Sequence, residues 1–330
     1  MTSSEIHLEA AGRPVRLTSP DKVLFPATGW TKQDVAEHYL MCAEGAVRGV
    51  HHRPCSLKRW PGGVDEKFFF TKRVPSTIRN AVEVRFPSAR PGRMAYVEDV
   101  SDIVEQVQLG VLDLNPWNGR IDHPDHADEL RIDLDPTEGF SFDDCRTVAS
   151  ATRDLLEEVG LVGWPKTSGS RGIHVYARLE PRWTYGEVRR AVLALGREME
   201  RRLPGLATTE WWKEERQGVF LDYNQNARDK TVASAYSIRQ TGLVSTPFTW
   251  DELGTIDPGA MTLEGFRDRW AAVGDLTGGI DESAGSLEPL LAMVAADEEQ
   301  GLGDAPWPPH YRKQPGEPPR VQPSKRRMEE

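Results

Sequence analysis

The sequence predicts an α+β fold, because helical and strand-like segments follow one another irregularly along the chain. Three segments carry apolar residues at helical spacing, and six short segments alternate apolar and polar residues as strands do. The strict β-α-β rhythm of a doubly wound sheet is absent from the sequence. The chain of 330 residues is long enough to bury a sizeable core, as one large domain or as two lobes.

Three helices are expected, each with its own signal. The first covers 31–43, where a threonine followed by Asp34 forms a capping pattern. The second covers about 143–159, with Gly160 as its stop. The third covers about 185–203, with apolar residues at helical spacing. Strands are expected at 94–98, 103–108, 130–135, 172–178, 218–223 and 232–238.

Prolines dominate the last part of the chain. Residues 305–330 have neither a helical nor a strand period and should form an extended tail, in contact with the body through Trp307 and Tyr311. We therefore expect a body, residues 1–295, followed by a Pro-rich C-terminal tail, residues 296–330.

The net charge of −10 does not exclude a nucleic-acid partner, because the charge is unevenly distributed. Eight acidic residues and no lysine or arginine lie between Ala271 and His310. Subtracting these eight charges leaves −2 for the rest, where basic residues recur beside glycines and aromatics. The local field, rather than the total charge, governs phosphate binding.

The composition is that of a soluble globular protein, with 38% hydrophobic and 28% charged residues. No apolar run approaches the roughly 20 residues needed to cross a bilayer, and the N-terminal segment lacks a signal-peptide core. The three cysteines, Cys42, Cys55 and Cys145, are far apart and odd in number. They indicate buried thiols in a reducing cytosol rather than a disulfide framework or a zinc site.

Three aspartates carry most of the chemical information. Asp133 and Asp135 alternate with aliphatic residues, so both carboxylates should lie on one face of a strand. Two like charges this close repel each other, and a cation between them is their natural partner. Asp222 lies in a second apolar segment, and if its strand lies beside the first, three carboxylates converge. Such hard oxygen ligands suit two Mg²⁺ or Mn²⁺ ions, which can clamp an in-line phosphoryl transfer. For the first pair alone, a solvated strand face is the alternative.

A second signal is the loop Lys166–His174, Lys-Thr-Ser-Gly-Ser-Arg-Gly-Ile-His. Its small residues let backbone N–H groups approach a phosphate, while Arg171 adds charge and His174 adds a donor. A plain Ser/Gly turn is the alternative, and the Gly-Lys-[Ser/Thr] of a Walker loop is absent from this loop. Segment 123–126, His-Pro-Asp-His, has no cysteine or third histidine nearby in the sequence and is interpreted as a polar turn.

Aromatic and basic residues occur together in a third place. Lys58-Arg-Trp-Pro-Gly-Gly63 precedes three phenylalanines, 68–70, and stacked bases and phosphates require such neighbours. Core packing is the alternative for these rings, and we expect one or two of the three inside. Arg239 ends the segment 233–239 and could deliver a guanidinium to a triphosphate, although a surface arginine is the alternative.

The ordered set of motifs resembles the primase-polymerase domain of bacterial ligase D, in the archaeo-eukaryotic primase superfamily. The set comprises Asp133-Leu-Asp-Pro136, Lys166–His174, Asp222-Tyr-Asn-Gln-Asn226 and Tyr236-Ser-Ile-Arg239. Segments 20–26, 58–61 and 115–117 are similar too, so the likeness spans roughly 17–255. The resemblance implies a primase-like catalytic core of largely antiparallel sheets flanked by helices in residues 1–295, whose N-terminal part carries a surface for DNA and its 5′-phosphate.

The resemblance also implies a role for each motif residue. Asp133, Asp135 and Asp222 would be the catalytic ligands of two divalent ions, Mn²⁺ or Mg²⁺. The nucleotide would be bound by Lys58, Phe69, Phe70, Asn115, Ser168, Arg171, His174, Gln225 and Arg239, with Phe69 or Phe70 stacked on the base. DNA would be bound by Lys22, Lys32 and Arg216, the two lysines gripping the 5′-phosphate of a downstream strand.

The implied activity is template-dependent DNA or RNA synthesis that fills short gaps or extends ends in DNA repair, with a preference for ribonucleotides and with primase activity. Because the polymerase-like part fills the chain, it resembles stand-alone actinobacterial relatives. We expect a cytoplasmic, nucleoid-associated enzyme with no membrane partner. Its substrates would be gapped or primer-template DNA and NTP or dNTP. A separate ligase and end-binding repair proteins would be its protein partners. Two residues depart from the family. Asn115 replaces a usual histidine and cannot carry a proton, and Arg171 replaces a usual lysine and changes the donor geometry.

Two other functions fit part of the sequence. A two-metal nuclease or phosphohydrolase explains the aspartates, but not the aromatic residues or the triphosphate-like loop. A non-catalytic scaffold that binds DNA ends would use the 5′-phosphate pocket, but the intact set of three aspartates counts against it.

Overall fold

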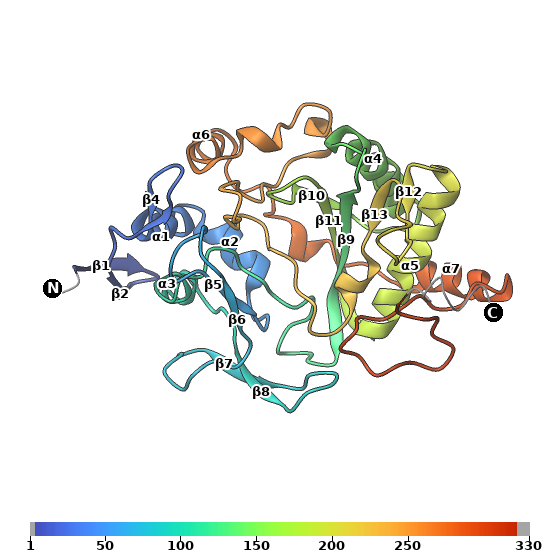
Figure 1. Ribbon diagram of the computed structural model, residues 1–330, viewed down its shortest axis with the longest axis horizontal. Helices are drawn as coiled ribbons and strands as arrows, with labels where there is room; N and C mark the ends of the chain where they lie inside the picture. Colours follow the sequence, from blue (N-terminus) through green and yellow to red (C-terminus); the bar gives the residue numbers. More distant parts are fainter. Residues whose placement is uncertain (1–3, 322–330) are drawn as a thin grey trace.

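A five-stranded sheet lies in the middle of the molecule (Figure 1). The structure is a computed structural model that describes residues 4–321. The strand order is β10-β11-β9-β13-β12, in which β12 and β13 are parallel and the other neighbours are antiparallel. The strands are β9 (His126–Pro136), β10 (Trp164–Thr167), β11 (Ile173–Thr184), β12 (Ala207–Thr208) and β13 (Val219–Leu221).

Two helices, α4 (Phe142–Glu158) and α5 (Tyr185–Arg202), cover one face of this sheet. Both helices begin with a capping box, which satisfies backbone N–H groups of the first turn. Leu130, Ile132 and Leu134 of β9 are fully buried in the same hydrophobic cluster as the inward residues of the helices. Burial of each such side chain contributes about 1.5–3 kcal/mol. The alternation of β9 therefore places its charged residues on the opposite face.

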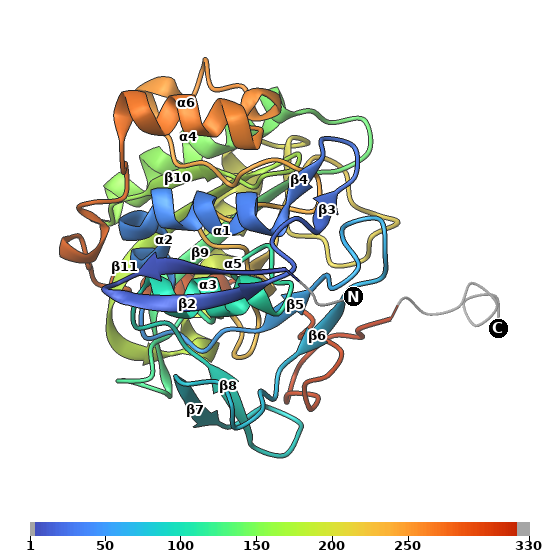
Figure 2. The same ribbon diagram turned by 90° about the vertical axis from the view of Figure 1, so that its left-hand side faces the viewer.

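The N-terminal half forms a second layer, on the left in Figure 1 and facing the viewer in Figure 2. Its apolar side chains build a second hydrophobic cluster, which also contains Tyr236, Ile238 and Phe266 from the C-terminal half. The four strand pairs are antiparallel. The elements are β1 (Glu5–Ala10), β2 (Arg13–Thr18), β3 (Val23–Phe25), β4 (Trp30–Thr31), α1 (Lys32–Met41), α2 (Ala43–Val50), β5 (Leu57–Arg59), β6 (Phe69–Thr71), β7 (Ala81–Val84), β8 (Gly92–Ala95) and α3 (Val100–Gln108).

The remaining elements connect the two layers and carry the tail. They are the 3₁₀ helices η1 (Tyr223–Asn226), η2 (Trp250–Glu252), η3 (Pro258–Ala260) and η4 (Ile280–Glu282), with α6 (Leu263–Val273) and α7 (Glu288–Glu299). The tail contacts α5, where Trp307 lies over the Arg189 guanidinium at 4.1 Å. The Tyr311 hydroxyl donates to the carbonyl of Arg228. The expected contact of the tail through these two aromatic residues is confirmed, and residues 322–330 lie outside the described residues.

The three expected helices correspond to α1, α4 and α5, but some strand predictions were wrong. Segment 103–108 lies in α3, because Val100, Ile103, Val104 and Val107 form one buried helical stripe and Asp99 caps it. Segment 232–238 is irregular, with a single bridge at Ile238 and a left-handed backbone at Tyr236. The chain division expected at residue 296 falls inside α7.

The three cysteines are free and buried, as expected. Between residues 4 and 321, no helix is both long and apolar enough to cross a membrane.

Candidate active site

A row of four polar residues crosses the sheet on the face that α4 and α5 leave open. The strand register pairs Lys166 of β10 with His174 of β11, and His174 with Asp133 of β9. The backbone N–H of Asp222, just after β13, donates to the carbonyl of Asp133 at 3.1 Å. Residues paired across neighbouring strands share a face. The sheet thus brings the distant Asp222 beside the strand of Asp133 and Asp135, as the sequence predicted.

The charges of the three aspartates act on one another. Burial raises the pKa of Asp133 to about 6. The negative charge of Asp133, followed by burial, raises the pKa of Asp135 to about 7 although its side chain is exposed. Burial and then the charge of Asp133 raise the pKa of Asp222 to about 7. Three carboxyl groups with raised pKa values at one place favour a bound cation.

Within residues 4–321, one buried carboxylate oxygen among the aspartates has no hydrogen-bond donor. His174 Nε2 lies 3.1 Å from Asp133 Oδ1 but is not aligned for a hydrogen bond, so this buried oxygen has no donor among the described residues. Asp222 accepts hydrogen bonds from Gln225 Nε2 at 2.9 Å and from the backbone of Asn224 at 3.1 Å. The residues therefore fit divalent ions that prefer oxygen ligands. Among the described residues the three carboxylates do not lie within 4.8 Å of one another as a set, and Asp133 and Asp135 are already separated by the two-residue repeat of β9.

The motif that follows Asp222 fixes its position through amide side chains. Asn226 exchanges two hydrogen bonds with the backbone of Arg131 in β9, at 2.9 and 2.7 Å. Its side chain thus continues the ladder where β13 ends. Asn224 Oδ1 accepts from the buried Arg189 at 2.7 Å. These hydrogen bonds explain why residues 223–226 include three amide side chains.

The loop between Lys166 and His174 joins two members of this row. Ser168 Oγ accepts hydrogen bonds from the N–H groups of Ser170 and Gly172, at 3.1 and 3.0 Å. Gly172 has no space for a side chain, since an added Cβ would lie 2.2 Å from the carbonyl oxygen of Leu134. His174 is buried, whereas Arg171 is exposed and adds positive charge near Asp135. The loop therefore packs closely against β9 beside the aspartates.

Asp113 joins three of the expected nucleotide-binding residues. Its carboxylate lies 3.7 Å from Lys58 Nζ and 3.5 Å from Arg239 Nε, and it accepts from Asn115 Nδ2 at 3.1 Å. Arg239 also donates to the carbonyl of Ser168 at 3.0 Å, which connects this group to the loop. The structure thus brings residues from four distant segments to one place with two cations.

The phenylalanines do not pack inside. Phe68, Phe69 and Phe70 are 42–51% exposed, so the expectation that one or two are buried was wrong. The pairing of β5 with β6 places Phe70 opposite Lys58 and Phe69 opposite Arg59. Cross-strand partners share a face, so Phe70 lies on the face of Lys58 and Phe69 on the other. The exposed ring on the lysine face is the better placed of the two to stack on a base.

The expected DNA-binding residues fall into two groups. Lys22 and Lys32 are neighbours, since the backbone N–H of Lys32 donates to the carbonyl of Lys22 at 2.8 Å. Burial and then the charge of Lys22 lower the pKa of Lys32. The Lys22 ammonium donates to the carbonyl of Pro61, and the Lys32 ammonium donates to the carbonyl of Thr18 at 2.8 Å. Arg216 instead donates to the carbonyls of Glu210 and Trp211, both at 2.8 Å.

Sequence reasoning missed two residues of the site. Asp113 lies two positions before Asn115. Its partners Lys58 and Arg239 are too distant in the chain for any spacing rule to find. Lys166 opens the glycine-rich loop and received no role. It is buried, and its Nζ lies within 2.9 Å of His174 Nδ1, Ser245 Oγ and the Ala233 carbonyl. Three acceptors match the three N–H groups of an ammonium, although burial lowers the pKa of Lys166.

Comparison with known proteins gives consistent matches. The family described as LigD, primase-polymerase domain, matches residues 31–277. The chain is 36% identical to the multifunctional non-homologous end joining protein LigD of Mycolicibacterium smegmatis, over 82% of this chain and 36% of that protein. It is 35% identical to LigD of Mycobacterium tuberculosis, over 83% of this chain and 38% of that protein. The chain therefore spans little more than a third of the length of these curated relatives.

A solved structure gives the same result. The polymerase domain from Mycobacterium tuberculosis ligase D in complex with DNA superimposes with a TM-score of 0.74 and 34% identity, over 82% of this chain and 99% of that chain. This similarity confirms the expected α+β, primase-like fold. Together with the family match over most of the sequence, it shows that the chain belongs to the LigD primase-polymerase domain family.

Proposed function

We propose that the chain is a template-dependent polymerase that fills short gaps or extends ends during DNA repair. Its family is one of metal-dependent, DNA-directed nucleotidyltransferases, and the relatives are named for non-homologous end joining. The main support in the structure is the backbone hydrogen bond between Asp222 and Asp133, which joins the acidic strands beside the Asp113 cluster. A nuclease would need the carboxylates but not the two cations and the exposed phenylalanine beside them.

Each group of residues would have a separate task. Asp133, Asp135 and Asp222 would hold two divalent ions, with Mn²⁺ preferred. The bound ions would neutralise charge on the triphosphate and lower the pKa of the attacking primer hydroxyl. Arg239 and Lys58 flank Asp113, and there they would bind phosphate oxygens with charge-assisted hydrogen bonds.

The loop and the aromatic hairpin would position the nucleotide. Ser168, Arg171 and His174 would contact the triphosphate, and Phe70, more directly than Phe69, would stack on the base. Asn115 is held by Asp113 and would contact the nucleotide without transferring a proton. Gln225 orients Asp222 and would lie close to the nucleotide or template.

The DNA would be bound on the N-terminal side. Lys22 and Lys32 would bind the 5′-phosphate of the downstream strand, which gives a preference for gaps. Arg216 already donates to its own loop, so we assign it to shaping the wall beside Asp222. A preference for ribonucleotides and primase activity are part of the proposal.

The test is primer extension on one- to several-nucleotide gaps, with ribo- and deoxynucleotides, in Mn²⁺ or Mg²⁺. We expect extension by the natural chain and a loss of more than about a hundredfold in Asp222→Asn. Asp143→Asn, an exposed aspartate on α4, is the matched control and should extend normally. Shortening of the primer, or full extension by Asp222→Asn, would refute the assignment.

The 5′-phosphate pocket has its own assay. Binding to gapped DNA with and without the downstream 5′-phosphate should differ, and Lys32→Gln should remove that difference. Lys213→Gln, at an exposed position, is the control. Equal affinities for both DNAs in the natural chain would remove the role of Lys22 and Lys32.

A further inference from the structure

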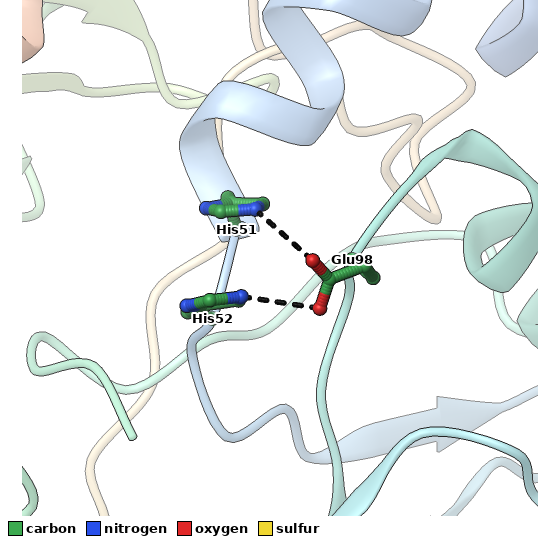
Figure 3. A group of neighbouring side chains, drawn as sticks. All are labelled: His51, His52 and Glu98. Atoms are coloured by element: carbon green, nitrogen blue, oxygen red, sulfur yellow. Dashed lines mark hydrogen bonds and ion pairs between the residues drawn. The ribbon is translucent and has the colours of Figure 1, made fainter. Parts of the chain in front are cut away.

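Two histidines and a glutamate form a cluster that shares no residue with the proposed active site (Figure 3). One ligand atom from each of His51, His52 and Glu98 lies within 4.8 Å of the other two, and this is the one such group of three among residues 4–321. His52 Nε2 lies 3.1 Å from one carboxylate oxygen of Glu98, and His51 Nε2 lies 4.0 Å from the other. Figure 3 shows both imidazoles turned towards this carboxylate.

The distances are close to those of a metal site. Two donors bound to a tetrahedral zinc ion at about 2.0–2.1 Å are roughly 3.3 Å apart. The two distances to Glu98, 3.1 and 4.0 Å, bracket this value. The imidazole rings are stacked, with centroids 4.0 Å apart and an interplanar angle of 14°, so their Nε2 lone pairs are nearly parallel, and each ring must rotate by roughly 50° to direct both Nε2 atoms at one tetrahedral ion.

His52 faces a carboxylate at each of its ring nitrogens. Its Nδ1 lies 2.9 Å from Asp122 Oδ2, on the side opposite Glu98. A neutral imidazole has one N–H, so it can satisfy one carboxylate while its other lone pair faces the second. A second ring proton or a metal cation at Nε2 removes this conflict. A histidine that donates Nδ1–H to a carboxylate and binds metal through Nε2 is a common arrangement in metal sites.

The backbone holds the ligands in place. His51 follows the last residue of α2, where the partial negative charge of the helix end favours a cation. The N–H of His52 donates to the carbonyl of Val97, beside Glu98, at 2.9 Å, and the N–H of Ile121 donates to the carbonyl of His52 at 2.8 Å. His52 also has a left-handed backbone, with φ 57°, which is rare for residues other than glycine. Segments 51–52, 97–98 and 121–122 are thus fastened together around the cluster.

The electrostatic surroundings do not oppose a cation. Arg120 is the nearby permanent cation, and it is paired with Asp128 at 2.9 Å and with Asp281 at 2.7 Å.

We propose that His51, His52 and Glu98 bind one divalent transition-metal ion of the Zn²⁺ class, with Asp122 orienting His52. Two imidazoles and one carboxylate are typical ligands of zinc, with the fourth position left to solvent. The all-oxygen set of Asp133, Asp135 and Asp222 instead suits Mn²⁺ or Mg²⁺. The ion would fasten the end of α2 to the start of α3, and the site does not depend on the proposed polymerase activity.

The test is calorimetric titration of the metal-free full chain with Zn²⁺ at pH 7.5, in excess Mg²⁺ and without nucleotide or DNA. The Mg²⁺ competes for the three aspartates. We expect one Zn²⁺ site of micromolar or tighter affinity in the natural chain. His52→Asn should weaken it more than tenfold, because asparagine tolerates the left-handed backbone but is a poor zinc ligand. Asp122→Asn should weaken it by about 10- to 100-fold.

The matched control is His7→Asn, which removes an exposed histidine from β1 and should bind Zn²⁺ like the natural chain. Zn²⁺ should also raise the unfolding temperature of the natural chain and of His7→Asn, but not that of His52→Asn. The absence of a micromolar site in the natural chain would overturn the proposal. Equal Zn²⁺ affinity in His52→Asn would overturn it as well.

Discussion

Lowering the pH from 8 to 6 should strongly weaken Mn²⁺ binding at the three aspartates. The pKa values of Asp222 and Asp135 are both raised to about 7, the first mainly by burial and the second mainly by the charge of Asp133. A carboxyl group must lose its proton before it binds the ion, so a pKa near 7 costs roughly tenfold in affinity at pH 6. Asp135 is exposed, and solvent screening reduces its contribution to the loss of Mn²⁺ affinity. We therefore expect a total loss of about 10- to 100-fold.

The assay is Mn²⁺ titration of the full chain at pH 6, 7 and 8, followed by electron paramagnetic resonance of the free ion. An aspartate with its usual pKa near 3.9 is ionised throughout this range and would give no change. Asp222→Asn should bind more weakly and with a shallower pH dependence, whereas Asp143→Asn should reproduce the natural profile. An affinity that is the same at pH 6 and pH 8 would refute the reasoning.

Three further outcomes follow from the same geometry. Raised pKa values make the folded state bind more protons than the unfolded chain, so the stability of the metal-free chain should fall as the pH rises from about 4 to 7. In urea unfolding at pH 8, Asp222→Asn should therefore be more stable than the natural chain by on the order of 1–3 kcal/mol. A destabilised variant would contradict this. Gly172→Ala should lower the free energy of unfolding by about 1–3 kcal/mol and reduce primer extension, because the added Cβ would lie 2.2 Å from the backbone of β9. Unchanged stability in urea unfolding would contradict this. Phe70→Ala should weaken nucleotide binding by about 1–3 kcal/mol in a fluorescence titration. The effect should be larger than that of Phe69→Ala, because Phe70 shares a face with Lys58. The reverse order would contradict the hairpin geometry.

Local patterns predicted much of the site. The alternation of residues 130–135 correctly placed Asp133 and Asp135 on the face opposite the buried aliphatic residues. Capping patterns located α1, and helical spacing located α4 and α5, because these signals depend on neighbouring residues. The juxtaposition of Asp222 with Asp133 was a conditional prediction, and the strand register confirms it.

The failures share a physical cause. Short apolar runs fit a helix and a strand equally well, and the capping box at Asp99 decides in favour of α3 at 103–108. Tyr236 adopts a left-handed backbone where a strand was expected, and its hydroxyl donates to Asp275 at 2.6 Å, a contact that no local pattern reveals. Asp113 is invisible for the same reason, since Lys58 and Arg239 reach it only through the tertiary fold.

The central claim is that Asp133, Asp135 and Asp222 jointly hold the ions that the reaction uses. Its most direct test is anomalous diffraction from crystals of the chain grown with Mn²⁺, gapped DNA and a non-hydrolysable nucleotide. The account predicts manganese peaks within ligand distance of these three carboxylates, with the triphosphate beside Arg239. Manganese bound elsewhere, or a triphosphate distant from the aspartates, would contradict it.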